Sequence, residues 1–288
     1  MKKVLVILGS TASGKSALAV KLAKKFNGEI ISADSRQVYK GLDIGTGKIT
    51  KKEMRGVPHY LLDVADPKKQ FSVSEYKKLA EDNIRYIVCY GKLPIVVGGT
   101  GFYIDALTGR ANFPDVPPNK SLRAKLNKLS KEKLFVMLKK KDPRRARSID
   151  MHNKVRLVRA LEIVEALGKV PLRQPATSTQ YEFVFIGLRP DDLDKRILKR
   201  LMKRIPGILR ETKKLSRKRA FELGLEYRFA SLYLQKKLSK KEFIDKLYTA
   251  IRHYAKRQMT WFKRNKKIRW FDPRQLKEIE KYAKRQYF

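Results

Sequence analysis

The sequence Gly9-Ser-Thr-Ala-Ser-Gly-Lys-Ser16 follows the apolar segment Val4–Leu8 and precedes a segment with helical periodicity from Ala17 to Phe26. The pattern G-x-x-x-x-G-K-[ST] between a strand and a helix is typical of a phosphate-binding loop. Its backbone N–H groups and the positive end of the helix surround an anion, while the lysine reaches the outer phosphate and the serine can bind Mg²⁺. A phosphate-bearing substrate is therefore predicted. The residues expected to hold it are Gly9, Thr11, Ala12, Ser13, Gly14, Lys15 and Ser16, with Ser16 as the metal ligand.

Strand-like and helix-like segments alternate along the chain. The strand-like segments are apolar, β-branched or aromatic and comprise Val4–Leu8, Glu29–Ser32, Tyr60–Val64, Pro94–Val97 and Tyr181–Leu188. Helical periodicity covers Ala17–Phe26, Ser72–Tyr90 and Phe102–Leu107, and it resumes at Leu193. This alternation predicts an α/β fold in which a parallel sheet that carries the phosphate-binding loop is flanked by helices.

Polar clusters follow three of the predicted strands, at Gly9–Ser16, Asp34–Gln37 and Gly98–Gly101. The carboxyl ends of parallel strands meet at one edge of a sheet, where ligands bind. We therefore expect the three clusters to lie in one crevice.

The composition changes at two breaks, Phe113–Pro118 and Pro171–Thr179. The segment between them is rich in lysine and helical in pattern, so we expect a small helical insert at 113–179. The remaining residues, 1–112 and 180–288, are expected to form the catalytic core, which ends in basic helices.

The charge of the chain is strongly asymmetric. There are 68 Lys and Arg residues against 28 Asp and Glu residues, a formal net charge of +40. Residues 1–112 carry 19 basic and 10 acidic residues, whereas residues 113–288 carry 49 and 18. General lysine enrichment explains part of this excess but not its uneven distribution, which favours a polyanionic partner for the second part of the chain.

Cys89 is the single cysteine, so it cannot form an internal disulfide, and its apolar neighbours predict a buried structural thiol. No segment has the length of a transmembrane helix or the pattern of a signal peptide. We expect a cytoplasmic protein that does not bind a membrane.

A phosphate-binding loop most often belongs to a kinase or an ATPase, which also needs an acidic residue near the magnesium ion. The apolar strand Ile95–Val97 ends in glycines instead, and Asp63 can be either that residue or a turn aspartate. The hypothesis of a nucleotide kinase or RNA-dependent ATPase is therefore weakened but not excluded.

Several motifs, in the same order, resemble the tRNA dimethylallyltransferase family, also called tRNA isopentenyltransferases or IPP transferases. They are Gly9–Ser16, Ile30–Gly47, Val57–Val64, Phe71–Val73, Pro94–Gly101, Asp142-Pro143, Ile149-Asp150, Arg156, Arg159–Glu162 and Tyr254–Trp261. The resemblance implies transfer of a dimethylallyl group from dimethylallyl diphosphate to N6 of an adenosine. That adenosine is position 37, 3′ to the anticodon, in tRNAs that read codons beginning with U. The products are N6-(dimethylallyl)adenosine and diphosphate, and the family implies Mg²⁺ as the cofactor.

The resemblance also implies roles for three side chains. Asp34 matches the general base, although a turn or magnesium-shell aspartate is the alternative. Thr100 matches a threonine that binds the reacting end of the diphosphate, yet its position also suits a helix N-cap. Arg200 matches an arginine that contacts the diphosphate; because Gly207 departs from the family spacing, Lys199 or Arg204 are alternatives, as is a solvated helix face.

The anticodon stem-loop of tRNA is the implied macromolecular partner, bound by a monomer. The implied contacts are Asp34, Ser35, Arg36, Gln37 and Thr100 around the target base, and Arg123, His152, Asn153, Lys154, Val155 and Arg156 along the stem-loop. Splayed-out bases in RNA loops are read by hydrogen bonds and stacking. His59 and His152 suit turns or RNA contacts better than metal binding, and Tyr254 and Trp261 at helical spacing suit a core better than base stacking.

Two positions depart from the family pattern. Ser10 replaces a proline in the phosphate-binding loop, which changes stiffness rather than chemistry. Glu226 stands where the family has glycine, so the RNA contacts expected of the Leu223–Tyr227 segment are in doubt.

Overall fold

The computed structural model describes residues 2–111, 114, 116–172 and 180–287. The chain divides into two compact units: unit 1 comprises Met1–Arg110 and Ser178–Phe288, and unit 2 comprises Ala111–Thr177. Both breaks in composition lie partly outside the described residues.

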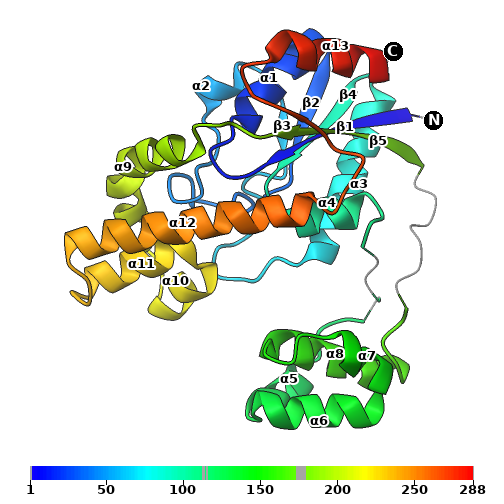
Figure 1. The fold of residues 1–288 in the computed structure, drawn as a ribbon, viewed down its shortest axis with the longest axis vertical. Helices are drawn as coiled ribbons and strands as arrows, with labels where there is room; N and C mark the ends of the chain where they lie inside the picture. The colour runs from blue at the N-terminus through cyan, green and yellow to red at the C-terminus, as the bar shows by residue number, and fades with distance from the viewer. Residues whose placement is uncertain (1, 112–113, 115, 173–179, 288) are drawn as a thin grey trace. The chain divides into compact units, whose positions relative to one another are not determined.

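Unit 1 is built on a six-stranded sheet in which every pairing is parallel (Figure 1). The strands are β1 (Lys2–Gly9), β2 (Gly28–Ser32), β3 (His59–Tyr60), β4 (Leu93–Gly98), β5 (Tyr181–Leu188) and β6 (Arg269–Phe271). Their order is β3-β2-β4-β1-β5-β6, so β1 lies between β4 and β5 in the middle of the sheet. The predicted α/β class and the return of the chain to the sheet at β5 are confirmed.

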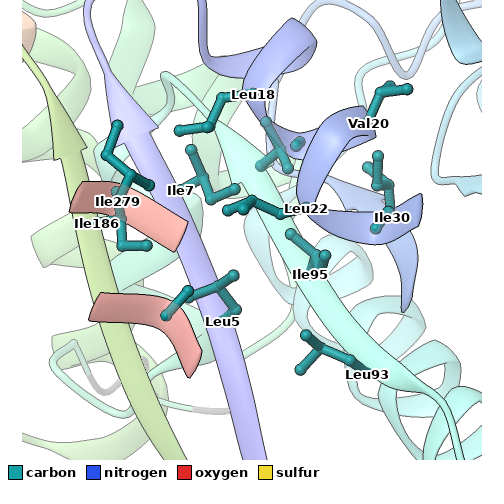
Figure 2. Packing of buried hydrophobic residues seen from close by; sticks show 14 of the residues in the cluster. Leu5, Ile7, Leu18, Val20, Leu22, Ile30, Leu93, Ile95, Ile186 and Ile279 are labelled. Atoms are coloured by element: carbon teal, nitrogen blue, oxygen red, sulfur yellow. The ribbon is translucent and has the colours of Figure 1, made fainter. Parts of the chain in front are cut away.

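Helices cover both faces of this sheet, because successive strand residues point to opposite faces and are apolar on each of them. The helices of unit 1 are α1 (Lys15–Lys25), α2 (Lys51–Met54), α3 (Val73–Cys89), α4 (Gly101–Leu107), α9 (Leu193–Thr212), α10 (Arg217–Leu223), α11 (Leu225–Leu234), α12 (Lys240–Phe262) and α13 (Leu276–Tyr287). On one face, Leu18 and Leu22 of α1 and Ile279 of α13 pack on Ile7 and Ile95 (Figure 2). On the other face, α3 and α4 pack on the apolar strand residues that point to that side of the sheet.

The helices α9, α11 and α12 form a separate layer with its own apolar core. Ile197 and Leu201 of α9 share a core with Ala230 of α11 and with Leu247 and Ile251 of α12. The long helix α12 begins with a capping box, in which the Ser239 side chain accepts from the Glu242 N–H and the Glu242 side chain accepts from the Ser239 N–H. This arrangement satisfies backbone donors that the helix leaves unpaired and fixes where α12 starts.

Unit 2 is a small helical domain with its own core. It contains α5 (Lys120–Asn127), α6 (Lys131–Lys141), α7 (Pro143–Ser148) and α8 (Lys154–Leu167). Leu134 and Leu138 of α6 pack against Leu157 and Leu161 of α8. The buried Asp142 caps α7 by accepting from the Arg145 N–H, and it also accepts from the Val170 N–H.

Two predictions about unit 1 are wrong. The predicted strand Tyr60–Val64 ends at Tyr60, because Leu61 and Asp63 have φ values of 61° and 57°, which a strand does not accommodate. Cys89 is exposed rather than buried, since the face of α3 that packs on the sheet carries Ile84 and Ile87. In addition, β6 and α13 near the C-terminus were not predicted. Within the described part of the chain, no helix is long and apolar enough to span a membrane.

The packing of α1 on the sheet leads to a first prediction. Leu22 is fully buried between α1 and the sheet, so Leu22→Ala leaves a cavity and should lower the free energy of unfolding by about 2–5 kcal/mol. Denaturant unfolding followed by tryptophan fluorescence measures this, because Trp261 and Trp270 both lie in unit 1. Lys24→Ala, on the exposed side of the same helix, should change the value by less than about 0.5 kcal/mol. Equal effects of the two substitutions would contradict the packing.

Candidate active site

The structure brings the three polar clusters together at the carboxyl edge of the sheet. They line a cavity of about 320 Å³. The lining residues from these clusters are Thr11, Lys15, Ser16, Asp34, Ser35, Arg36, Gln37 and Gly98, and Val97 of β4 lines the cavity beside them. The opposite side comes from Arg200, the Leu223–Tyr227 segment, Ile251, Tyr254, Arg257 and Gln258. Helices far along the chain therefore complete a site that the first hundred residues begin.

The phosphate-binding loop has the geometry of an anion cradle. Gly14, at the N-cap of α1, has a φ of 91°, and the first turn of α1 contains no acidic residue. A Cβ atom at Gly9 would lie 2.8 Å from the Leu188 carbonyl oxygen, so only glycine fits there. The hydroxyl of Ser13 is buried and has no hydrogen-bond partner among the described residues. This hydroxyl does not line the cavity, so the cradle residues that face the cavity are Thr11, Lys15 and Ser16.

The Lys15 side chain is fixed beside this cradle by a hydrogen bond to the backbone. Its Nζ donates to the Ser10 carbonyl oxygen at 3.0 Å. Burial lowers the pKa of Lys15 to about 8; the nearby Asp34 carboxylate opposes this shift, and the Arg200 guanidinium adds to it. A bound anion would replace the lost hydration and favour the charged form of the lysine.

Asp34 combines the two roles that the sequence left open. Its Oδ1 accepts the N–H groups of Arg36 at 2.9 Å and Gln37 at 3.3 Å, so it does organise a turn. The same side chain lines the cavity together with Lys15. Within the described residues its Oδ2 accepts no hydrogen bond, so one carboxylate oxygen builds the loop and the other is available to a ligand.

Thr100 stands at the N-cap of α4, but its side chain makes no capping hydrogen bond. Its Oγ1 instead accepts the Ser35 N–H at 3.0 Å, and its own N–H donates to the Ala33 carbonyl oxygen at 3.2 Å. The capping interpretation is therefore right for the position and wrong for the side chain. Thr100 ties the loop after β4 to the loop that carries Asp34.

The structure separates the three candidates for the diphosphate-contacting cation. Arg200 lines the cavity, whereas Lys199 is exposed and Arg204 lines only a second, adjoining cavity. Arg200 also lines this second cavity of about 460 Å³, which shares Ser16 with the first and is rich in basic residues. Burial and the neighbouring Arg204 lower the pKa of Arg200, so its charge is poorly compensated by the protein. Such a guanidinium favours an anionic ligand.

Gln258 is a site residue that the sequence reasoning missed. Its Oε1 accepts the Thr11 N–H at 2.9 Å, and its Nε2 donates to the Gly99 carbonyl oxygen at 2.8 Å. The side chain is buried, and a Cβ atom at Gly99 would lie 2.4 Å from its Nε2. One amide on α12 thus joins the loops after β1 and β4. Its place in the quoted Tyr254–Trp261 motif was the available signal.

The two aromatic residues of α12 have different surroundings. Trp261 packs in the core, where its Nε1 donates to Asp105 Oδ2 at 2.9 Å, and a Cβ atom at Gly101 would meet its ring. Tyr254 lines the cavity instead, and burial together with the Asp34 carboxylate raises its pKa. Trp261 therefore has the predicted core role, whereas that prediction does not hold for Tyr254, which lines the cavity.

The divergent Leu223–Tyr227 segment faces the same cavity. Glu226 Oε1 accepts from Arg204 Nη2 at 3.2 Å, so the extra carboxylate is paired with a neighbouring guanidinium. Asp63, the alternative magnesium aspartate, pairs with Lys48 at 2.6 Å and does not line the site.

The candidate RNA contacts of unit 2 are of two kinds. Arg123 forms two hydrogen bonds of 2.7 Å with Glu162, and Asn153 caps α8 by accepting the Arg156 N–H at 3.2 Å. Lys154 donates to the Asn127 carbonyl oxygen at 2.8 Å. The side chains left at the surface are His152, Val155 and Arg156. Thus Arg123, Asn153 and Lys154 build the unit, while His152, Val155 and Arg156 form its exposed face near the start of α8.

Histidines contribute no metal site. His59 Nδ1 lies 2.8 Å from the Val57 carbonyl oxygen, and burial lowers its pKa. Among residues 2–111, 114, 116–172 and 180–287, no group of three His, Cys, Asp or Glu side chains is placed to hold a metal ion.

Comparison with known proteins gives a consistent result. A family model described as IPP transferase matches residues 37–265. A tRNA dimethylallyltransferase of Anoxybacillus flavithermus is 41% identical, with 94% of this chain and 90% of that protein covered. One from Thermoanaerobacter sp. (strain X514) is 40% identical, with 98% and 95% covered.

Solved structures are similar over nearly the whole chain. A tRNA isopentenylpyrophosphate transferase from Bacillus halodurans has a TM-score of 0.73 at 36% identity and covers 100% of this chain and 97% of its own. A eukaryotic dimethylallyltransferase acting on tRNA has a TM-score of 0.85 at 27% identity, with 99% and 77% covered.

The hydrogen bonds of Gln258 lead to a second prediction. Gln258→Ala leaves the Thr11 N–H and the Gly99 carbonyl unpaired, which should lower the free energy of unfolding by about 2–4 kcal/mol. Gln258→Glu keeps an acceptor for Thr11 but brings a carboxylate oxygen against the Gly99 carbonyl and adds negative charge near the cradle. It should therefore weaken binding of magnesium diphosphate, measured by calorimetry, by at least about tenfold. Gln180→Glu, an exposed control with the same change of charge, should bind as the wild type does; wild-type binding by Gln258→Glu would refute the role.

Proposed function

This chain belongs to the IPP transferase family and transfers a dimethylallyl group to tRNA, and from that premise we propose how its own residues do so. The donor is dimethylallyl diphosphate. The acceptor is N6 of the adenosine at position 37, beside the anticodon of tRNAs that read codons beginning with U. One observation carries the proposal: the anion cradle and Asp34 line the same cavity. The alternative of a P-loop kinase or RNA-dependent ATPase is not favoured by the relatives.

The cradle receives the diphosphate as a leaving group. Lys15 and Arg200 supply positive charge, and the backbone N–H groups in the first turn of α1 supply fixed donors. As the C1–O bond of the donor breaks, negative charge grows on the diphosphate oxygens. Donors arranged before the reaction stabilise this charge without reorganising, which lowers the barrier.

Asp34 acts on the nucleophile. Nitrogen N6 of the adenine attacks C1 of the dimethylallyl group, the C1–O bond breaks and diphosphate departs, and the surplus proton of N6 passes to the free Oδ2 of Asp34. The turn made by Oδ1 keeps this carboxylate in place. Thr100 orients the same loop by accepting the Ser35 N–H, although it does not itself line the cavity. Contact of its hydroxyl with the reacting end of the diphosphate stays a prediction. Val97, Leu223 and Ile251 give the cavity apolar lining for the prenyl chain.

Mg²⁺ suits this donor set. Magnesium keeps several waters and commonly takes few protein ligands together with substrate phosphates. The Ser16 hydroxyl lies where the two cavities adjoin, and the described residues offer no cluster of three carboxylate or imidazole ligands, so the ion would enter with the diphosphate. Ser16 would hold it, and it would neutralise part of the diphosphate charge.

The anticodon stem-loop is the proposed RNA partner. The target base would leave its stack to reach Asp34, with Ser35, Arg36 and Gln37 around it and Tyr254 available for stacking. His152, Val155 and Arg156 offer an exposed surface on unit 2. The excess of basic residues in 113–288 predicts binding that weakens steeply with salt. A monomeric state and a cytoplasmic location stay predictions.

The direct test is incubation with dimethylallyl diphosphate, Mg²⁺ and a mixed tRNA pool, followed by digestion to nucleosides. N6-(dimethylallyl)adenosine should form, and fragment mapping should place it at position 37. Absence of the prenylated nucleoside with intact tRNA would refute the proposal. Preferential prenylation of free AMP over tRNA would indicate an enzyme that modifies nucleotides instead.

A third prediction concerns Asp34. Asparagine at position 34 keeps an oxygen that accepts the Arg36 and Gln37 N–H groups but cannot take a proton from N6. Asp34→Asn should therefore lower single-turnover transfer about 10²–10⁴-fold while leaving the tRNA dissociation constant within about twofold. Wild-type turnover in this variant would remove Asp34 as the general base.

A fourth prediction concerns pH. The pKa of free Lys15 is about 8, and a bound diphosphate raises it, so the complex holds one more proton than the free protein above pH 8. Affinity for dimethylallyl diphosphate without tRNA should thus fall as the pH rises above about 8, by up to about tenfold per unit. Lys15→Arg stays charged and should show a flatter profile, which also corrects for titration of the ligand itself. Parallel profiles would show that Lys15 does not titrate in this range.

A further inference from the structure

The loop Asp43–Gly47 forms a wall between the two cavities. Gly45 and Thr46 line the smaller cavity, while Asp43, Ile44 and Gly47 line the larger one. The loop carries no proposed catalytic group. What it does carry is an unusual number of hydrogen bonds from charged side chains to its backbone.

The N–H groups of the loop are bound by Glu211 of α9. Oε1 accepts the N–H groups of Asp43 at 2.9 Å and Ile44 at 2.7 Å, and Oε2 accepts that of Gly45 at 2.8 Å. The Tyr227 hydroxyl also donates to Oε2, at 2.9 Å. Glu211 is buried, so this carboxylate exchanges its hydration for four protein donors, as a buried charge must.

The carbonyl groups of the loop are bound by arginines of the same helix. Arg204 donates from Nε to the Ile44 oxygen at 2.6 Å and from Nη2 to the Gly45 oxygen. Arg200 donates from Nη2 to the Gly47 oxygen at 2.8 Å. The hydrogen bond from Arg200 to the Gly47 carbonyl joins the loop to a proposed diphosphate ligand. The position of that carbonyl therefore helps to set the direction of the Arg200 guanidinium.

The loop packs closely against these partners. A Cβ atom at Gly45 would lie 2.5 Å from Tyr227 Cζ, and one at Gly47, where φ is 62°, would lie 2.4 Å from Arg200 Nη2. Ile44 packs against Gly207 of α9, where a Cβ atom would lie 2.4 Å from Ile44 Cδ1. A shift of the loop would thus displace Arg200 or be blocked by side chains on α9 and α11.

We propose that Glu211 is a positioning residue for Arg200. It fixes the Asp43–Gly47 loop through three N–H groups, and the loop in turn holds Arg200 toward the diphosphate through the Gly47 carbonyl. The inference rests on the proposed function of Arg200 as a diphosphate ligand. Glutamine at position 211 would keep one acceptor oxygen but would turn an NH₂ donor toward groups that are themselves donors, so the loop would lose its fixed place.

A double-mutant cycle on dimethylallyl diphosphate binding tests this, measured by calorimetry with Mg²⁺ and without tRNA. Arg200→Ala should weaken binding about 30-fold and Glu211→Gln about tenfold. If Glu211 acts through Arg200, the double variant should bind about 30-fold more weakly than the wild type, whereas independent effects would multiply to about 300-fold. Multiplying effects would overturn the inference, because a residue needed only for general folding would not couple specifically to Arg200.

Two variants guard the interpretation. Tyr227→Phe removes a single hydrogen bond to Glu211, and it should weaken binding about threefold in the wild-type background and not at all in Arg200→Ala. It replaces Glu211→Gln in the cycle if that variant fails to fold. Glu222→Gln, an exposed glutamate on α10, should bind as the wild type does. A wild-type protein that binds no dimethylallyl diphosphate would refute the proposed function, whereas normal binding with a threefold loss that persists in Arg200→Ala would refute this inference alone.

Discussion

The buried amide of Gln258 joins the two loops on which the proposed chemistry depends. Thr11 belongs to the phosphate cradle and Gly99 precedes Thr100, and one side chain on α12 binds the backbone of both. The position of α12 is set in turn by its packing on α9 and α11 and by the hydrogen bond that Trp261 donates to Asp105. The catalytic geometry is therefore coupled to helices that lie about 150 or more residues further along the chain than the loops they hold.

Charges around the cavity suit the proposed departure of diphosphate. Lys15 and Arg200 raise the local positive potential, and Asp34 lies close enough to Lys15 to oppose the lowering of its pKa. A reaction in which a neutral amine displaces diphosphate needs this pairing, with cations at one end and one proton acceptor at the other. The loop Asp43–Gly47 is fixed as well, because charged side chains of α9 bind both the N–H groups and the carbonyl groups of its backbone.

Much of this architecture is predictable from the sequence, because local patterns determine it. The phosphate-binding loop, the parallel strands and the helical insert each have a periodicity or composition that does not depend on distant residues. The resemblance to a family added Asp34, Thr100 and Arg200, which spacing alone does not distinguish from a turn, a cap and a solvated cation. The errors have local physical causes: the positive φ of Leu61 ends β3, and the helical phase of α3 exposes Cys89.

What sequence reasoning missed are contacts between distant segments. Gln258 and Glu211 look like ordinary polar helix residues in the sequence. Only the folded chain shows that each forms hydrogen bonds with loops more than 150 residues away.

The central claim is that diphosphate in the cradle presents C1 of the dimethylallyl group to Asp34. A crystal structure with the unreactive thiolo analogue of dimethylallyl diphosphate tests it most directly. The account predicts diphosphate oxygens on Lys15, Ser16 and Arg200, with C1 in the smaller cavity beside Asp34; an analogue bound with C1 turned into the larger cavity, away from Asp34, would contradict it.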